Sequence, residues 1–270
     1  MRLSIDHRTT YRFSKPQARL VQMLRLTPED THDQTVVAWR IDVDCDARLR
    51  SARDGFGNKV TMLYAEGPLD GLEIAVTGEV LTSETPGVLK GALDPLPPAV
   101  FCRTTPLTEA DGDFLGFVER TALSDNPLTR LHDLNGALNH RFRIVNARSD
   151  PARTASAAFA EERVTPRDLA QMMVAAARAI GAPARYVSGY CLSGFGGASR
   201  PTPHGWAEAY VDRIGWIAFD PCFGLSADEN YVRVAVGLDA AGAAPVAGSR
   251  LGPGDEELAV DVSVDAVGDS

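Results

Sequence analysis

The sequence predicts an α+β protein: an antiparallel β-sandwich domain over residues 1–83, then a core over residues 107–264 with helices packed on an antiparallel sheet. Up to residue 83, apolar and polar side chains alternate in short runs that turn residues separate. Residues 84–106 hold five prolines, which exclude regular structure over most of this connector. Beyond it, apolar residues recur at three- and four-residue steps, which is typical of helices, before strand-like runs return.

The N-terminal strands are predicted from the two-residue period of a half-buried sheet. Turn residues such as Ser14-Lys15-Pro16 and Asp54-Gly55 separate them. His7 is expected on an exposed strand face, as a surface or packing residue. The predicted strands are Leu3–Phe13, Val21–Leu26, Val36–Val43, Lys59–Tyr64 and Leu72–Leu81.

The core opens with two predicted helices, Leu107–Leu123 and Leu128–Phe142, with a stop-and-restart signal at Asn126-Pro127 between them. Residues 143–164 are expected to form a loop.

The next predicted helix begins at Pro166. Thr165 is a good N-cap, proline suits the first helical position, and Asp168 is placed to complete a capping box. One face of this helix is apolar, and Gly181 ends it.

Strands follow this helix, and two of them carry residues suited to catalysis. His204 precedes one strand and Asp220 follows the next, so the two side chains can meet as hairpin neighbours. An imidazole held by a carboxylate is the base-and-orienter half of a nucleophilic triad. The predicted strands are Arg185–Leu192, Trp206–Val211, Trp216–Phe219, Tyr231–Gly237 and Leu258–Val264, and residues 242–254 are expected to be a loop.

These blocks resemble the bacterial transglutaminase-like proteins, which share a papain-like Cys-His-Asp core. The family's Gly-Ile-Pro-Ala-Arg-Tyr-Val-Ser-Gly-Tyr, His-Ala-Trp and Trp-Val-Gly-Phe-Asp-Pro blocks are nearly intact from Gly181 onward. His204 falls on the family's histidine and Asp220 on its aspartate. Residues 1–83 resemble the N-terminal domain of the same proteins, through the stretches His7–Phe13, Leu24–Pro28 and Asp54–Asn58.

The resemblance fails at the nucleophile. An ungapped count back from Gly181 places the family's cysteine position on Pro166, and a one-residue insertion places it on Thr165. Proline has no nucleophilic side chain, and the expected role of Thr165 is to cap the helix. Since a missing nucleophile costs a triad enzyme on the order of 10⁶ in turnover, the site is expected to be degenerate.

Three functional readings remain open. The first is a catalytically inactive protein that acts as a binding or scaffolding partner through a retained His204–Asp220 pair. The second is an amide hydrolase or acyltransferase with a substitute nucleophile from Thr165, Cys191 or Cys222. The third is a binding module with no enzymatic ancestry at the site.

Composition limits the partners. The 270 residues carry a formal net charge of −9, which argues against a broad nucleic-acid or acidic-membrane surface. The four cysteines form no CxxC pair and have no zinc-ligand spacing with the histidines, so no metal or cofactor is expected. We expect a protein or peptide partner and no membrane association. We also expect a cytoplasmic location, where the cysteines remain thiols.

Overall fold

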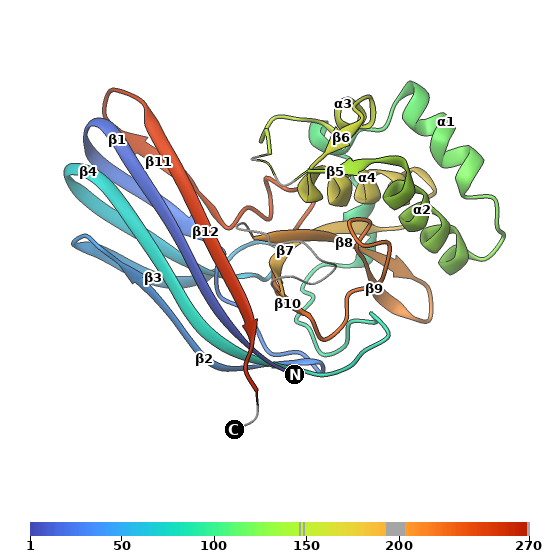
Figure 1. Cartoon of the computed structure of the whole chain (residues 1–270), viewed down its shortest axis with the longest axis horizontal. Coiled ribbons are helices and arrows are strands. Elements are labelled where there is room, and N and C mark those ends of the chain that lie inside the picture. The colour runs from blue at the N-terminus through green and yellow to red at the C-terminus, as the bar shows by residue number, and fades with distance from the viewer. Residues whose placement is uncertain (146, 148, 193–202, 269–270) are drawn as a thin grey trace.

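The computed structural model describes residues 1–145, 147, 149–192 and 203–268. A strand-rich unit lies beside a core in which helices cover one face of a smaller sheet (Figure 1). The α+β class predicted from the sequence is therefore confirmed.

Two long strands organise the N-terminal sheet. β1 (Arg2–Leu24) and β4 (Lys59–Thr82) pair antiparallel, with register shifts between Arg12 and Arg19. The sheet bends back at this point (Figure 1), beside the turn predicted at Ser14. β2 (Gln34–Val43) pairs with one half of β4, and β3 (Ala47–Arg53) pairs with the other half.

One apolar core lies between the two halves of this folded sheet. It joins Tyr11 and Ile74 from the first half to Leu20 and Leu63 from the second. A sheet that folds over its own core makes the sandwich that the alternating pattern predicted.

Two strands from the end of the chain complete this sheet. β11 (Val246–Leu251) and β12 (Glu256–Ala266) pair antiparallel with opposite halves of β1. The prediction had placed residues 246–251 in a loop and had assigned the final strand to the core unit 107–264. Both placements are wrong, because both segments pair with β1 through long-range backbone contacts. Residues 246–251 lie in a Gly- and Ala-rich stretch that carries little hydrophobic pattern of its own.

The core sheet has the strand order β10-β7-β8-β9, all antiparallel. Its strands form where aromatic and β-branched residues predicted them, although β8 starts two residues early. Their bounds are β7 (Ala184–Cys191), β8 (His204–Val211), β9 (Gly215–Phe219) and β10 (Tyr231–Gly237).

Helix α4 (Pro166–Ala179) packs against this sheet, and nearly all of its residues are buried. The other helices surround α4, so its polar flanks are covered as well as its apolar face. The remaining elements are η1 (Pro98–Cys102), η2 (Pro106–Thr108), α1 (Gly112–Thr121), α2 (Pro127–Arg141), β5 (Arg143–Ile144), α3 (Ala155–Phe159) and β6 (Arg163–Val164).

Candidate functional site

The structure brings His204 and Asp220 together. His204 is the first residue of β8, and Asp220 directly follows β9, its hairpin partner. The ring nitrogen Nε2 of His204 lies 2.6 Å from the carboxylate oxygen Oδ2 of Asp220. Both residues are buried, so the pair is shielded from water. This is the orienting contact of a nucleophilic triad.

Two further groups hold the Asp220 carboxylate. The Tyr231 hydroxyl donates to Oδ2 at 2.8 Å, and the backbone N–H of Cys222 donates to Oδ1 at 2.8 Å. Burial, and then the neighbouring Asp220 charge, raise the pKa of Tyr231 above its ordinary value, so its hydroxyl remains a donor. A buried carboxylate with three polar partners keeps a fixed orientation toward His204.

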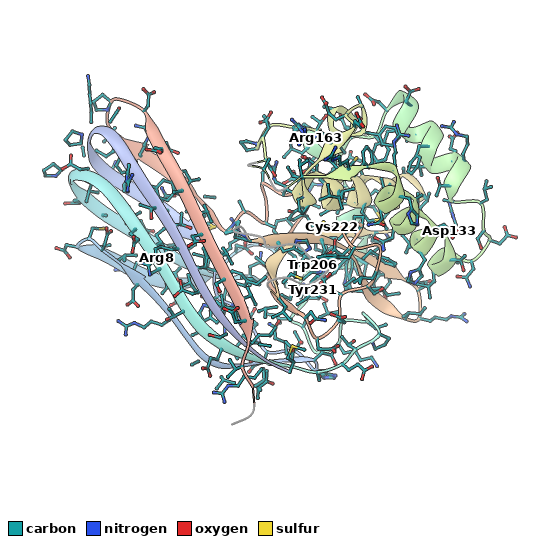
Figure 2. All side chains as sticks on the ribbon, in the orientation of Figure 1. Arg8, Asp133, Arg163, Trp206, Cys222 and Tyr231 are labelled. Carbon is teal, nitrogen blue, oxygen red and sulfur yellow. The ribbon has the colours of Figure 1, made fainter. Side chains whose placement is uncertain are left out.

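Aromatic rings fix the imidazole from the sides. The rings of Trp206, Phe223 and Tyr231 lie with centroids 5.8–6.2 Å from the His204 ring. Figure 2 shows Trp206 and Tyr231 on the face of the core sheet opposite the helices, where the two rings meet edge to face at 5.3 Å. Trp206 is thus a core residue that supports His204.

The two candidate nucleophile positions face different hollows. Pro166, the first residue of α4, lines a cleft of about 610 Å³ together with His204. Thr165 lines a separate hollow of about 560 Å³. Of these two positions, Pro166 is the one that shares a hollow with His204.

The Thr165 hydroxyl is committed to the helix cap. It accepts from the backbone N–H of Asp168, its oxygen lies 2.7 Å from a carboxylate oxygen of Asp168, and the Ser149 hydroxyl lies 2.7 Å away on another side. Asp168 returns the contact by accepting from the backbone N–H of Thr165, which completes the predicted capping box.

Neither cysteine proposed as a substitute nucleophile is among the described residues that line the His204 cleft. Cys222 is 4% exposed and packs in the core cluster beneath α4, while its backbone supports Asp220. Cys191, at the end of β7, packs beside the Trp206–Tyr231 cluster.

The cleft lies where the core meets the N-terminal sheet. Tyr186 and Ser188 of β7 line it from the core, and burial raises the pKa of the Tyr186 hydroxyl. Most of the remaining wall is small and apolar, and β11 and β12 supply part of it through Ala247, Leu258 and Val260. Concave hollows with mostly apolar walls and a few polar groups are typical of ligand sites.

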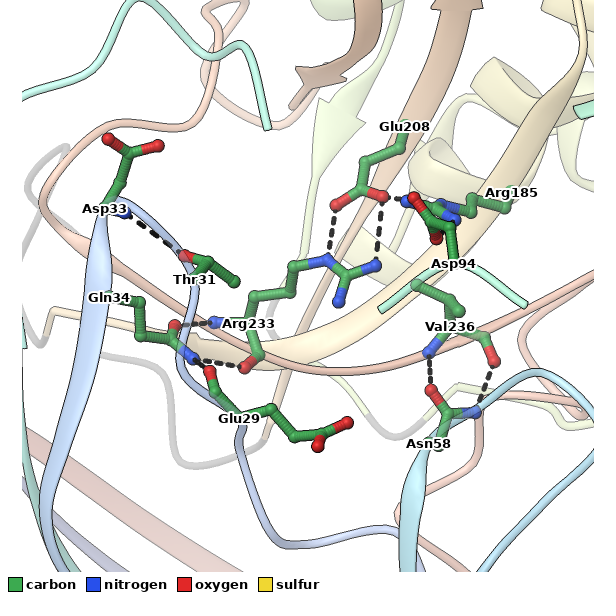
Figure 3. Close-up of polar contacts among 10 residues, drawn as sticks. All are labelled: Glu29, Thr31, Asp33, Gln34, Asn58, Asp94, Arg185, Glu208, Arg233 and Val236. Carbon is green, nitrogen blue, oxygen red and sulfur yellow. Dashed lines mark hydrogen bonds and ion pairs between the residues drawn. The ribbon is translucent and has the colours of Figure 1, made fainter. Parts of the chain in front are cut away.

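Sequence reasoning missed a buried ion cluster behind the core sheet (Figure 3). Glu208 contacts Arg185 at 2.6 Å and Arg233 at 2.7 Å, and Arg185 also contacts Asp94 at 2.5 Å. Burial opposes the Glu208 charge, but the two guanidinium groups outweigh it and lower the pKa of Glu208 to about 2. The direct pairing of Arg185 with Glu208 across β7 and β8 is the signal that could have found the cluster.

The described residues show neither a metal site nor a membrane-spanning helix. They contain no group of three His, Cys, Asp or Glu side chains placed to hold a metal ion. No helix within the described ranges has the length and hydropathy needed to cross a membrane.

The fold is that of a transglutaminase-like protein. Residues 3–81 match the bacterial transglutaminase-like N-terminal region, and residues 116–221 match the transglutaminase-like superfamily. The chain belongs to the bacterial transglutaminase-like proteins, as its sequence blocks had indicated.

Relatives of similar length exist in mycobacteria. An uncharacterised protein of Mycobacterium bovis is 27% identical over 297 residues, which cover 98% of this chain and 92% of the relative. An uncharacterised protein of Mycobacterium leprae is 26% identical over 276 residues, with 97% and 98% covered. The solved structure of a candidate cysteine protease from Cytophaga hutchinsonii matches this chain with a TM-score of 0.77 at 18% sequence identity. The match covers 100% of this chain and 92% of that protein's chain, and it shows a similar fold.

Proposed function

We propose that this chain is a catalytically inactive transglutaminase-like protein that binds a peptide or a protein segment in the His204 cleft. One observation carries the proposal: Pro166, on which the ungapped comparison puts the family's cysteine position, begins α4 and lines the cleft together with His204. Thiolates are favoured at helix N-termini because the helix dipole lowers their pKa, and proline offers neither a thiol nor an N–H there.

The cleft itself supports a binding role. Its walls are largely alanine, proline and aliphatic side chains, and its volume of about 610 Å³ suits several residues of an extended segment. His204, Tyr186 and Ser188 provide polar contacts on one side of it.

The well-ordered His204–Asp220 pair favours a second candidate, an amide hydrolase or acyltransferase with a substitute nucleophile. This reading requires a hydroxyl or thiol within ~3 Å of the His204 ring. The burial of Cys222 in the core and the commitment of Thr165 to its cap weigh against it. We rank it second for that reason.

Restoring the nucleophile tests the proposal. Ammonia release and amide hydrolysis are measured with glutamine-containing peptides for the wild type, Pro166→Cys, Thr165→Cys and Pro166→Cys combined with His204→Ala. Thr165→Cys is the matched control, because it adds a thiol one residue away in the other hollow. In parallel, binding of the same peptides to the wild type is measured by calorimetry.

The expected result is peptide binding without turnover by the wild type, and turnover by Pro166→Cys that His204→Ala removes. Turnover by the wild type that depends on His204 contradicts the inactive reading and favours the substitute nucleophile. Absence of both binding and restored turnover contradicts the peptide cleft. A cytoplasmic location belongs to the same proposal.

A further inference from the structure

The hollow that Thr165 lines, next to the His204 cleft, is rich in arginine. It has a volume of about 560 Å³, and its lining includes Arg143, Arg153, Arg163 and Thr165. In Figure 2, Arg163 lies on the helix side of the core, away from Trp206 and Tyr231. The positive charge of these three guanidinium groups contrasts with the net charge of −9 of the whole chain.

Strand pairing forces two of these cations together. Arg143 and Arg163 are directly paired in the parallel register of β5 and β6, so their side chains leave the pair on the same face. Neither side chain has an ion pair or a hydrogen bond among the described residues, and the carboxylates of Glu161 and Glu162 form no ion pair with them. Like charges placed side by side on a sheet are unfavourable without a counter-charge.

The third cation is partly neutralised. A guanidinium nitrogen of Arg153 lies 3.5 Å from the carboxylate of Asp168, which is 1% exposed and is also held by the Thr165 cap. Arg143 and Arg163 therefore supply most of the net positive charge in the hollow. A guanidinium presents a planar fork of donors that matches a carboxylate or phosphate in two-point contacts.

The arginine hollow adjoins the His204 cleft. Ala147 lines both, and Thr165 of the hollow is followed in the chain by Pro166 of the cleft. We infer that the hollow binds the anionic side chain of a peptide, an acidic residue or a phosphorylated one, whose neighbouring residues occupy the cleft. This inference rests on the proposed function and names the class of segment that the cleft takes.

The test compares three alanine-rich peptides that differ only at one position, which is glutamate, phosphoserine or glutamine. Affinity for each is measured by calorimetry with the wild type and with the double variant Arg143→Gln/Arg163→Gln. The matched control is Arg48→Gln/Arg50→Gln, which removes the same charge from two exposed positions of β3. Ala241→Phe, at an exposed position on the cleft wall, narrows the cleft and leaves the arginines in place.

The expected result is that the wild type binds an anionic peptide about ten-fold more tightly than the glutamine peptide. The arginine variant loses that preference, Arg48→Gln/Arg50→Gln keeps it, and added salt reduces it. A larger gain for phosphoserine than for glutamate identifies a phosphorylated segment, and equal gains identify an acidic one.

Equal binding of all three peptides to the wild type, or an unchanged preference in the arginine variant, overturns the inference and leaves the peptide cleft standing. Inorganic phosphate tests the anion site independently of the cleft, because phosphate binding needs only the arginine hollow. If phosphate raises the melting temperature of the wild type and not of the arginine variant, while no peptide binds, the cleft proposal fails and the anion site stands. If neither phosphate nor any peptide binds, both fail.

Discussion

The side chain of Gln34 pairs with the backbone of Arg233 as a neighbouring strand would. Its amide oxygen accepts from the Arg233 N–H at 2.8 Å, and its amide nitrogen donates to the Arg233 carbonyl at 3.0 Å (Figure 3). Asn58 makes the same pair of contacts with Val236, each at 2.8 Å. Two amides of the N-terminal unit thus close the outer edge of β10, which would otherwise present unpaired backbone groups.

Gln34→Ala is expected to lower the free energy of unfolding by ~1–3 kcal/mol, because it leaves backbone groups of Arg233 without partners. Urea unfolding of the whole chain measures the change. Thr35→Ala, at the exposed neighbouring position, is the control and should stay within ~0.5 kcal/mol. An equal effect of the two substitutions would contradict the edge-closing role.

Thr165 is expected to act through the helix and not through catalysis. Thr165→Ala should lower stability by ~0.5–2 kcal/mol, because it removes the N-cap of α4, whereas Thr165→Ser should keep most of it. Affinity for the glutamine peptide, which has no anion for the hollow that Thr165 lines, should be the same in both variants when each is measured well below its melting temperature. Loss of binding in folded Thr165→Ala would show that this residue contributes to the cleft.

His7 is expected to make stability depend on pH. The exposed position expected for it was wrong: His7 is 1% exposed, and its ring contacts the hydroxyls of Tyr190 at 2.9 Å and Thr9 at 3.0 Å. Burial lowers the pKa of His7 to about 4 from 6.5. Because the unfolded chain binds the proton first, this contribution is present above pH 6.5 and is lost as the pH falls toward 4.

The expected loss over that window is on the order of 3 kcal/mol. Urea unfolding at a series of pH values measures it, and His7→Gln should flatten the curve between pH 6.5 and 4. His140→Gln, at an exposed position of α2, should leave the slope unchanged. If the free energy of unfolding of His7→Gln still changes as steeply with pH, groups other than His7 cause the pH dependence.

Gly205 is expected to be irreplaceable beside His204. An added Cβ would stand 2.0 Å from the Tyr186 hydroxyl oxygen, so Gly205→Ala must displace a ring that lines the cleft. The expected cost is ~1–3 kcal/mol, with weaker peptide binding. Gly136→Ala is the matched control: nothing lies within 4 Å of its added Cβ, and it sits inside α2, so a gain of ~0.5–1 kcal/mol is expected.

Local patterns predicted the elements that bury a regular face. The capped helix at Pro166 and the hairpin that joins His204 to Asp220 both follow from residues close in sequence. β3 escaped prediction because its residues are nearly all exposed and Leu49 is its only large apolar side chain, so it carries little hydrophobic signal. The closing amides of Gln34 and Asn58 join segments that are distant in sequence, and no local pattern encodes such partners. Tyr231 is near Asp220 in sequence but reaches it from β10, at the opposite edge of the sheet from β9.

The pairing of β12 with β1 has a consequence for how the chain reaches its fold. Leu3 is paired with Ala266, so β1 gains this partner only after β12 has been synthesised. Until residues 246–266 emerge, β1 lacks its outer partners, and the His204 cleft lacks the wall that Leu258 and Val260 supply. During synthesis the core can form earlier, but the binding surface is complete only once β12 has emerged.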